Sequence, residues 1–330
     1  MSFLTVIRPG PMVSVQDRGR YGLLDRGVSA SGPMDAEYLA IASALVGNRR
    51  NEAALEFAGF GGDYRAEEDV LVAVLAPGCS VRCGDRPLPV GESGWLRAGE
   101  TLRVGQVENG IWGYIAISGG IETPTVLGSR ATHLRSGLGG LAGRKLAAGD
   151  RLPLGERRGR ERLALPHLPY RMTGPIRVIP GPQDDYFDEA AWQTFLRSPY
   201  TVTVRSDRMG MQLDGSCIQS FRGHDIISDV TPLGAVQVPG TGLPVILLAE
   251  RQPTGGYPKI ATVASVDLPR LVQTRPGETV RFQTITQAQA ESLLLNARQE
   301  LEDLLRGLRA PRSLEERLND ENLISGIWFA

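Results

Sequence analysis

The stretch that decides the fold runs from Ser228 to Val263 and reads SDVTPLGAVQVPGTGLPVILLAERQPTGGYPKIATV. Two apolar runs, Ala235–Val238 and Pro244–Ala249, flank a Pro-Gly-Thr-Gly turn, so the stretch predicts two strands joined by a tight connection. A dense polar set, Glu250–Lys259, follows the second run. Rigid strands often present binding groups on such glycine-rich loops, and a solvated hairpin loop is the alternative interpretation.

The rest of the chain has the same short-strand character. Between Ala53 and Ile117, apolar runs such as VLVAVLA and WGYIAIS alternate with Gly, Pro and Asp, a pattern typical of a β-sandwich or barrel. Pro33–Val46, Asp184–Leu196 and Ala288–Leu308 have apolar residues at helical spacing. The sequence therefore predicts a mainly β protein with a few flanking helices.

Two short patterns recur in the same order in the two halves of the chain. Arg97–Arg103 (RAGETLR) resembles Arg275–Arg281 (RPGETVR), and Arg20–Asp25 (RYGLLD) resembles Arg208–Asp214 (RMGMQLD) with one residue inserted. Gly-Glu pairs are also common in the turns that precede hairpin strands, which is the alternative explanation of this recurrence. Because both patterns recur in order, the sequence favours an internal duplication.

Composition limits the class of protein. A chain of 330 residues has room for about two domains. Its net charge of −1 argues against nucleic-acid binding, and its longest apolar run, Val70–Ala76, is far shorter than the ~20 residues of a membrane helix. The start MSFLTVIRPG does not resemble a signal peptide, so we expect a cytoplasmic protein. Three scattered cysteines indicate neither a disulfide framework nor a metal site.

Five blocks of sequence, in order, resemble those of one family: Ser29–Asp35 (SASGPMD), Gly119–Gly140, Pro180–Asp185 (PGPQDD), Ser206–Gly210 (SDRMG) and the Ser228–Val263 stretch. The family contains the C subunit of 5-oxoprolinase, also called KipA, and is similar to allophanate hydrolase subunit 2 and to the carboxyltransferase domain of urea carboxylase. The resemblance implies two cyclophilin-like β-barrels. We expect them at 1–160 and 161–285, meeting near 155–175, with a helix and tail at 286–330.

Several enzyme classes do not fit the sequence. The segment TGGYPKIAT lacks the P-loop spacing before Lys259, and the chain has no G-x-S-x-G elbow. The histidines His133, His167 and His224 stand apart, with no metal-ligand spacing between them. No Met-Lys-Met motif occurs, so the chain is not expected to carry biotin itself.

The remaining polar residues suit the binding of an amide and a carboxylate. Arg208 and Arg251 can hold a carboxylate through paired hydrogen bonds, and Lys259 can place a positive charge on a developing oxyanion. We expect these three catalytic residues to line one pocket. The predicted substrate-binding residues are Gln237, Gln252, Thr254, Gly255, Gly256, Tyr257, Asp35 and Asp229.

Some of these residues also have a structural interpretation. Asp35 suits the negative charge that a helix N-terminus favours, and Asp229 suits an Asx-turn. Arg208 can bridge strands. The predicted site is therefore the cluster as a whole.

The resemblance implies one component of a multi-subunit 5-oxoprolinase, which couples ATP hydrolysis to the opening of 5-oxoproline to L-glutamate. Its implied partners are the KipI-like B subunit and the LamB/YcsF-like A subunit of that enzyme. ATP would be used by the assembled complex, and the chain alone is expected to be inactive. The alternatives are a carboxyltransferase-type subunit of a biotin-dependent urea or amide carboxylase, and a KipA-like regulatory binding protein.

The C-terminal segment Ser313–Ala330 begins with a capping-box pattern and ends in the apolar cluster IWFA. Bulky apolar groups seldom remain in water. We expect this segment to dock on a neighbour or on the chain's own surface.

Overall fold

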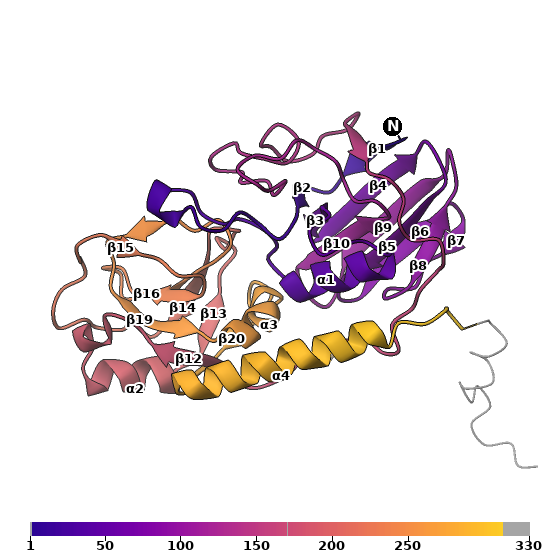
Figure 1. Cartoon of the computed structure of the whole chain (residues 1–330). Coiled ribbons are helices and arrows are strands. Elements are labelled where there is room, and N and C mark those ends of the chain that lie inside the picture. Colours follow the sequence, from indigo (N-terminus) through magenta and orange to yellow (C-terminus); the bar gives the residue numbers. More distant parts are fainter. Residues whose placement is uncertain (1, 170, 313–330) are drawn as a thin grey trace, which may run out of the picture.

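The computed structural model describes residues 2–169 and 171–312, and its strands form two separate bodies bridged by a long helix (Figure 1). Every strand up to Leu154 belongs to the first body, and every strand from Ile176 belongs to the second. The described residues of segment 155–175, where the halves are predicted to meet, contain neither helix nor strand. The protein is mainly β, as the sequence predicts.

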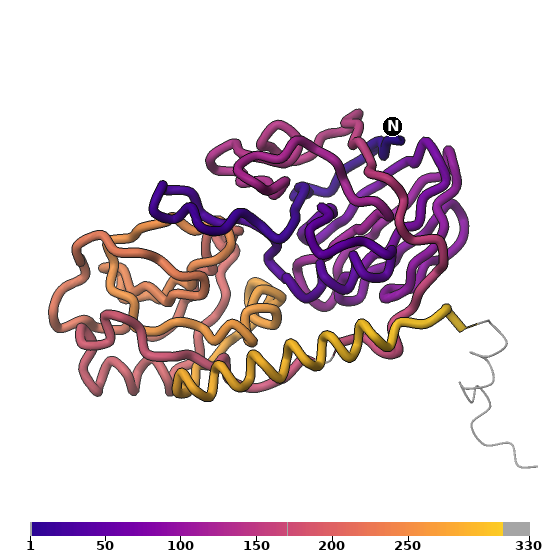
Figure 2. The backbone as a smooth tube through the Cα atoms, in the orientation of Figure 1, coloured from indigo at the N-terminus to yellow at the C-terminus, as the bar shows by residue number. Residues whose placement is uncertain are grey.

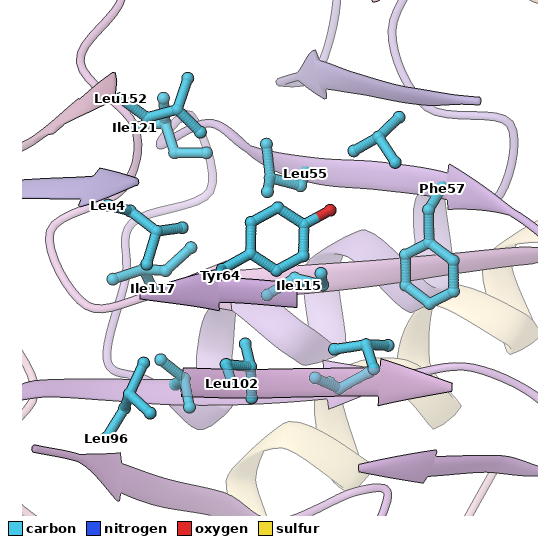
Figure 3. Close-up of a cluster of buried hydrophobic side chains, with 14 of the residues drawn as sticks. Leu4, Leu55, Phe57, Tyr64, Leu96, Leu102, Ile115, Ile117, Ile121 and Leu152 are labelled. Carbon is cyan, nitrogen blue, oxygen red and sulfur yellow. The ribbon is translucent and has the colours of Figure 1, made fainter. Parts of the chain in front are cut away.

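The N-terminal half consists of two antiparallel sheets. Its strands are β1 (Ser2–Pro9), β2 (Val13–Gln16), β3 (Ala54–Ala58), β4 (Phe60–Ala66), β5 (Val70–Leu75), β6 (Cys79–Cys83), β7 (Arg86–Pro87), β8 (Ser93–Leu96), β9 (Thr101–Val107), β10 (Trp112–Ile117) and β11 (Arg151–Leu154). The sheet orders are β11-β1-β4-β9-β6-β7 and β2-β3-β10-β5-β8. Side chains from both sheets, among them Leu4, Tyr64, Leu55 and Ile115, form one core (Figure 3).

Strands β5 and β10 are buried along their whole length. One face of each strand joins the core between the sheets, and the other face packs under helix α1 (Ala36–Leu45), where Leu71 and Tyr114 contact the helix cluster. Burial of both faces explains why these strands read as continuous apolar runs rather than as alternating patterns.

The C-terminal half has an eight-stranded sheet that closes into most of a barrel. The strands of this half are β12 (Ile176–Pro180), β13 (Tyr200–Val202), β14 (Gly210–Gly215), β15 (Asp229–Val230), β16 (Ala235–Gln237), β17 (Val245–Leu247), β18 (Thr254–Gly255), β19 (Lys259–Val263), β20 (Thr279–Val280) and β21 (Phe282–Thr284). The order is β20-β13-β14-β17-β16-β19-β12-β21, and β15 pairs with β18 in a separate ribbon. Phe195 stacks on Phe282 in its core, with ring centroids 4.5 Å apart.

The repeated Gly-Glu patterns form the same turn. The backbone N–H of Arg97 donates to Glu100 Oε2 at 2.9 Å, and that of Arg275 donates to Glu278 Oε2 at 2.8 Å. Both turns lead directly into strands, β9 and β20. A third such turn at 147–150 precedes β11, so the strand-like run Leu146–Leu154 forms a strand only over its last four residues.

The remaining helices flank the barrels. They are η1 (Leu24–Arg26), η2 (Asp184–Tyr186), α2 (Glu189–Arg197), η3 (Ser265–Asp267), α3 (Leu268–Val272) and α4 (Gln287–Arg306). The expected helix from Asp184 begins later because the Asp188 carboxylate, rather than that of Asp184, caps it by accepting from Ala191 N at 2.9 Å. No described helix has the length and apolar character needed to cross a membrane.

Helix α4 extends along both bodies (Figure 1 and Figure 2). It starts beside the C-terminal half, with a capping box between Thr286 and Gln289. Near its end, Leu301, Leu304 and Leu305 pack against the cluster around α1 in the N-terminal half. The helix therefore connects the two halves. The predicted docking segment at 313–330 lies outside the described residues.

Candidate functional site

The predicted hairpin of β16 and β17 forms, and strand β19 pairs with it. This pairing makes two polar residues neighbours. Strand β16 lies between β17 and β19, and Gln237 pairs across the ladder with Lys259. The register shifts between Val236 and Gln237, which is a β-bulge. Bulges commonly redirect a side chain beside a functional site.

Lys259 is fully buried, and its ammonium group lies 3.0 Å from Asp229 Oδ2. Gln183 links the same two residues, because its Nε2 donates to Asp229 Oδ2 at 3.2 Å and its Oε1 accepts from Lys259 N at 3.2 Å. The hydrogen bonds from Lys259 and Gln183 lower the pKa of Asp229. The Asp229 side chain is 44% exposed, so a buried cation sits behind a carboxylate that faces solvent.

A second group of polar atoms surrounds Gly255. A β-carbon at Gly255 would lie 2.5 Å from Gln237 Nε2 and 3.2 Å from Gln252 Nε2, so the missing side chain leaves the space where these two amides converge. Gln237 Nε2 is buried and has no hydrogen-bond partner among the described residues. Gly255 pairs with Asp229 across the β15–β18 ribbon, which joins this group to the Lys259 pair. The group can donate to the oxygen of a bound amide.

Arg251 is buried and anchored by carbonyl groups. Its Nε donates to Thr231 O at 2.7 Å and its Nη1 donates to Leu248 O at 3.4 Å. It forms no ion pair with a carboxylate in the described part of the chain. Burial lowers the pKa of Arg251 and outweighs the opposing effect of Tyr21. Thr231 also donates to Gln252 O, so Arg251 adjoins the Gly255 group.

Arg208 occupies a different environment from Lys259 and Arg251. Its Nε donates to Glu250 Oε1 at 2.6 Å, its Nη1 pairs with Glu56, and its Nη2 donates to Gly32 O at 2.7 Å. Burial alone would lower the pKa of Arg208, but the charges of Glu56 and Glu250 raise it. Because all three nitrogens are engaged, Arg208 has the bridging role that was its structural interpretation. Its contacts join the two halves rather than the Lys259 group.

Asp35 likewise belongs to the junction between the halves. Its carboxylate caps α1 by accepting from Tyr38 N at 3.1 Å. The other oxygen accepts from Arg171 at 2.8 Å and from Gln273 at 3.1 Å. These contacts match its interpretation as a helix N-terminal charge, and none of them reaches the Lys259 group.

The other predicted residues form the edge of the Gly255 group. Thr254 and Gln252 are exposed, and Tyr257 is 40% exposed. Gly256 O accepts from Ile226 N at 2.8 Å, which holds the segment before Asp229 against this loop. The structure therefore brings together Lys259, Asp229, Gln237, Gln252, Gly255 and Arg251, with Thr254, Gly256 and Tyr257 beside them.

Sequence reasoning missed several residues of the site and of the junction between the halves. Gln183 lies inside the PGPQDD block, which was a usable signal. Glu56 is a charged residue in a strand that is otherwise apolar, and such a position predicts a buried partner. Glu250 directly precedes Arg251, but its pairing with Arg208 is a long-range contact that spacing does not show. Among the described residues, no three His, Cys, Asp or Glu side chains gather as a metal site would require.

The described chain consists of two β halves, with a cluster of polar side chains around Lys259 and Gly255 in the second. The model of the family described as "Carboxyltransferase domain, subdomain A and B" matches residues 26–284. The chain therefore belongs to this family.

Relatives give the assignment finer detail. The chain is 36% identical to the C subunit of 5-oxoprolinase from Escherichia coli (strain K12), over 97% of this chain and 100% of that protein. It matches the crystal structure of the Kluyveromyces lactis (K. lactis) urea amidolyase with a TM-score of 0.86 and 29% identity, over 96% of this chain and 20% of that one. It matches the crystal structure of TTHA0988 with a TM-score of 0.76 and 36% identity, over 86% of this chain and 56% of that one.

Proposed function

We propose that this chain is one component of a multi-subunit, ATP-dependent 5-oxoprolinase and that it binds the lactam substrate. The observation that carries the proposal is the end-to-end match with the C subunit of the E. coli 5-oxoprolinase, which leaves no part of that protein uncovered. The partners in this proposal are a KipI-like subunit and a LamB/YcsF-like subunit. ATP is a reactant of the assembled complex, and no residue of this chain is assigned to it.

The group around Lys259 suits this chemistry. In the proposed reaction the lactam oxygen takes a phosphoryl group from ATP, which leaves as ADP, and water adds to the activated carbon. The carbon–nitrogen bond then breaks, the ring nitrogen takes up a proton, and a second water releases phosphate to give L-glutamate. The phosphoryl group transferred to the lactam oxygen carries negative charge on its own oxygens, to which the Lys259 ammonium and the unpartnered Gln237 amide can donate.

Reconstitution with the two cognate partner subunits tests the proposal. We expect 5-oxoproline-dependent release of phosphate and formation of glutamate from the complex, and neither activity from this chain alone. A complex that assembles but does not consume 5-oxoproline with ATP would refute the proposed function. Turnover by the purified single chain would refute its role as an incomplete part.

Substitution of Lys259 tests the proposed role of its charge. Because Lys259 is fully buried, Lys259→Ala would also leave a cavity, so Lys259→Met is the better variant. We expect kcat of the reconstituted complex to fall about 10²- to 10³-fold, with assembly unchanged. Lys145, the only other lysine, is exposed, and Lys145→Met serves as the control. Equal kcat values for the two variants would exclude Lys259 from the chemistry.

A second candidate is carboxyl transfer to urea or an amide in a biotin-dependent carboxylase. The structural match to the K. lactis urea amidolyase, which covers 96% of this chain, favours it. Biotin on another chain would then carry the carboxyl group, and the Gln237 and Gln252 amides would hold its acceptor. Urea-dependent, biotin-dependent ATP turnover would distinguish this candidate. Absence of both activities, with tight binding to another protein, would indicate a KipA-like regulatory role.

A further inference from the structure

Three arginines are buried in the described part of the chain, namely Arg20, Arg208 and Arg251. Arg208 pairs with two carboxylates. Arg20 and Arg251 form no ion pair with any described carboxylate and donate only to carbonyl groups. A buried cation without an anionic partner is costly, so two of them in one region call for an explanation.

Arg20 has a donor to spare. Its Nε donates to Val126 O at 3.4 Å and its Nη2 donates to Ala131 O, while its Nη1 is buried without a partner among the described residues. Asp17 lies near enough to act on Arg20, but its carboxylate is occupied by the Gly19, Ser129 and Arg130 donors. The guanidinium is therefore held in place by two carbonyls, with both N–H groups of Nη1 unused.

Ser29, in the SASGPMD block, supplies a second buried polar atom without a partner. The backbone N–H of Arg20 donates to Ala30 O at 2.8 Å, so Ser29 directly precedes the residue that pairs with Arg20. The Ser29 hydroxyl is buried and has no partner in the described part of the chain. A hydroxyl and a guanidinium N–H are a common pair of donors for a carboxylate oxygen.

Arg20 and Arg251 face the same region from opposite halves. Segment 17–32, which carries Arg20 and Tyr21, reaches over to the C-terminal half (Figure 1). Arg20 donates to Ala131 O, and the backbone N–H of Leu134, three residues further along that loop, donates to Glu250 Oε2 at 3.2 Å. Glu250 directly precedes Arg251, so both arginines adjoin this loop. Burial lowers the pKa of both arginines, and at Arg20 it outweighs the opposing charges of Asp17 and Glu250.

We propose that Arg20 and Ser29 of the N-terminal half, together with Arg251, hold the carboxylate of a carboxylate-bearing lactam or amide substrate. Arg20 thus takes the place that was predicted for Arg208, whose nitrogens are all engaged. The inference rests on the proposed function and adds the residues that recognise the substrate's carboxylate. The glycine-rich segment 17–32, with Tyr21 75% exposed, is the part that must move to admit the ligand.

Calorimetric titration of the assembled complex without ATP tests this proposal. The ligands are 5-oxoproline and 2-pyrrolidinone, which is the same lactam ring without the carboxylate. Arg20→Met should weaken 5-oxoproline binding by about 10- to 150-fold, as the loss of a charged hydrogen bond predicts, and leave 2-pyrrolidinone binding unchanged. Arg18→Met removes an exposed arginine two residues away and should behave as wild type. Arg20→Lys should restore part of the affinity.

Each result decides the proposal. Equal losses for both ligands, or none, would overturn it and leave Arg20 and Ser29 as sites for ordered water. A wild-type complex that does not prefer 5-oxoproline would also overturn it. If Arg20→Met fails to assemble, Ser29→Ala must weaken 5-oxoproline binding selectively, by about 10-fold. Selective binding without ATP-dependent turnover would refute the proposed function alone, and turnover unaffected by Arg20 would refute this inference alone.

Discussion

Arg208 illustrates how one side chain can hold the two halves together. It reaches Glu56 in the N-terminal half and Glu250 in its own half, and all three residues are buried. Glu56 also accepts from Tyr114 at 2.6 Å and from Met34 N at 2.7 Å. The junction therefore combines a connected polar network with apolar contacts, in which Met34 and Trp112 pack into the core of the C-terminal half. Connected polar networks fix one arrangement of their parts.

Removal of this arginine leaves two buried carboxylates without a counter-ion. We expect Arg208→Met to lower the free energy of unfolding by about 3–5 kcal/mol, as measured by urea denaturation. Arg205→Met, at an exposed arginine three residues earlier, is the matched control and should stay within about 0.5 kcal/mol of wild type. Equal midpoints for the two variants would contradict the bridging role.

At the scale of elements, the β15–β18 ribbon holds Gly255 against the Gln237 amide. A β-carbon there would approach Gln237 Nε2 to 2.5 Å, whereas at Gly256 the nearest atom lies 3.6 Å away. We expect Gly255→Ala to displace the amide and lower kcat/KM of the complex at least about 10-fold, with Gly256→Ala close to wild type. Steady-state kinetics of both variants measure this difference in kcat/KM, and melting temperatures check that both variants fold. Equal kcat/KM values for the two variants would contradict the role of Gly255.

Asp267 links strand β12 to helix α3. It is buried, and it accepts from Arg177 N and from Arg270 Nη2, each at 2.7 Å. Burial alone would raise its pKa, but these hydrogen bonds outweigh burial and hold it below the ordinary value of 3.8. Because the folded state binds this proton less tightly than the unfolded chain, the carboxylate stabilises the fold above about pH 4, and this contribution is lost as pH falls through the folded-state pKa.

We therefore expect Asp267→Asn to be less stable than wild type at pH 7 and to lose less stability on acidification below about pH 4. Urea denaturation at a series of pH values measures this difference. Parallel curves for the two proteins would show that Asp267 does not contribute to acid sensitivity.

The elements that sequence reasoning predicted well are those defined by local signals. The hairpin around the 239–242 turn and helix α4 follow from apolar spacing and turn residues. Strand ends were predicted too long because a turn such as that at 147–150 depends on a side chain meeting a backbone N–H. The partners of Arg208 were not predictable from spacing, because Glu56 lies 152 residues away in the sequence. Arg20, with its unused N–H, was likewise recognisable only once the loops were placed.

At the scale of the whole molecule, helix α4 is a further connection between the halves. Leu304 is 8% exposed and packs on the N-terminal half, whereas Leu295 on the same helix is 63% exposed. We expect Leu304→Ala to cost about 2–3 kcal/mol of unfolding free energy and Leu295→Ala almost nothing. Thermal or urea unfolding measures both variants, and similar values would mean that the end of α4 contributes little to stability.

Helix α4 also sets the order in which the protein can be completed during its synthesis. The N-terminal half has all its strands by residue 154, yet one face of its five-stranded sheet is covered partly by leucines from residues 301–308. Those leucines leave the ribosome only after the entire C-terminal barrel. While the C-terminal half is being synthesised, this apolar face of the N-terminal half therefore stays incompletely covered. The N-terminal half is made first, but its packing is completed last.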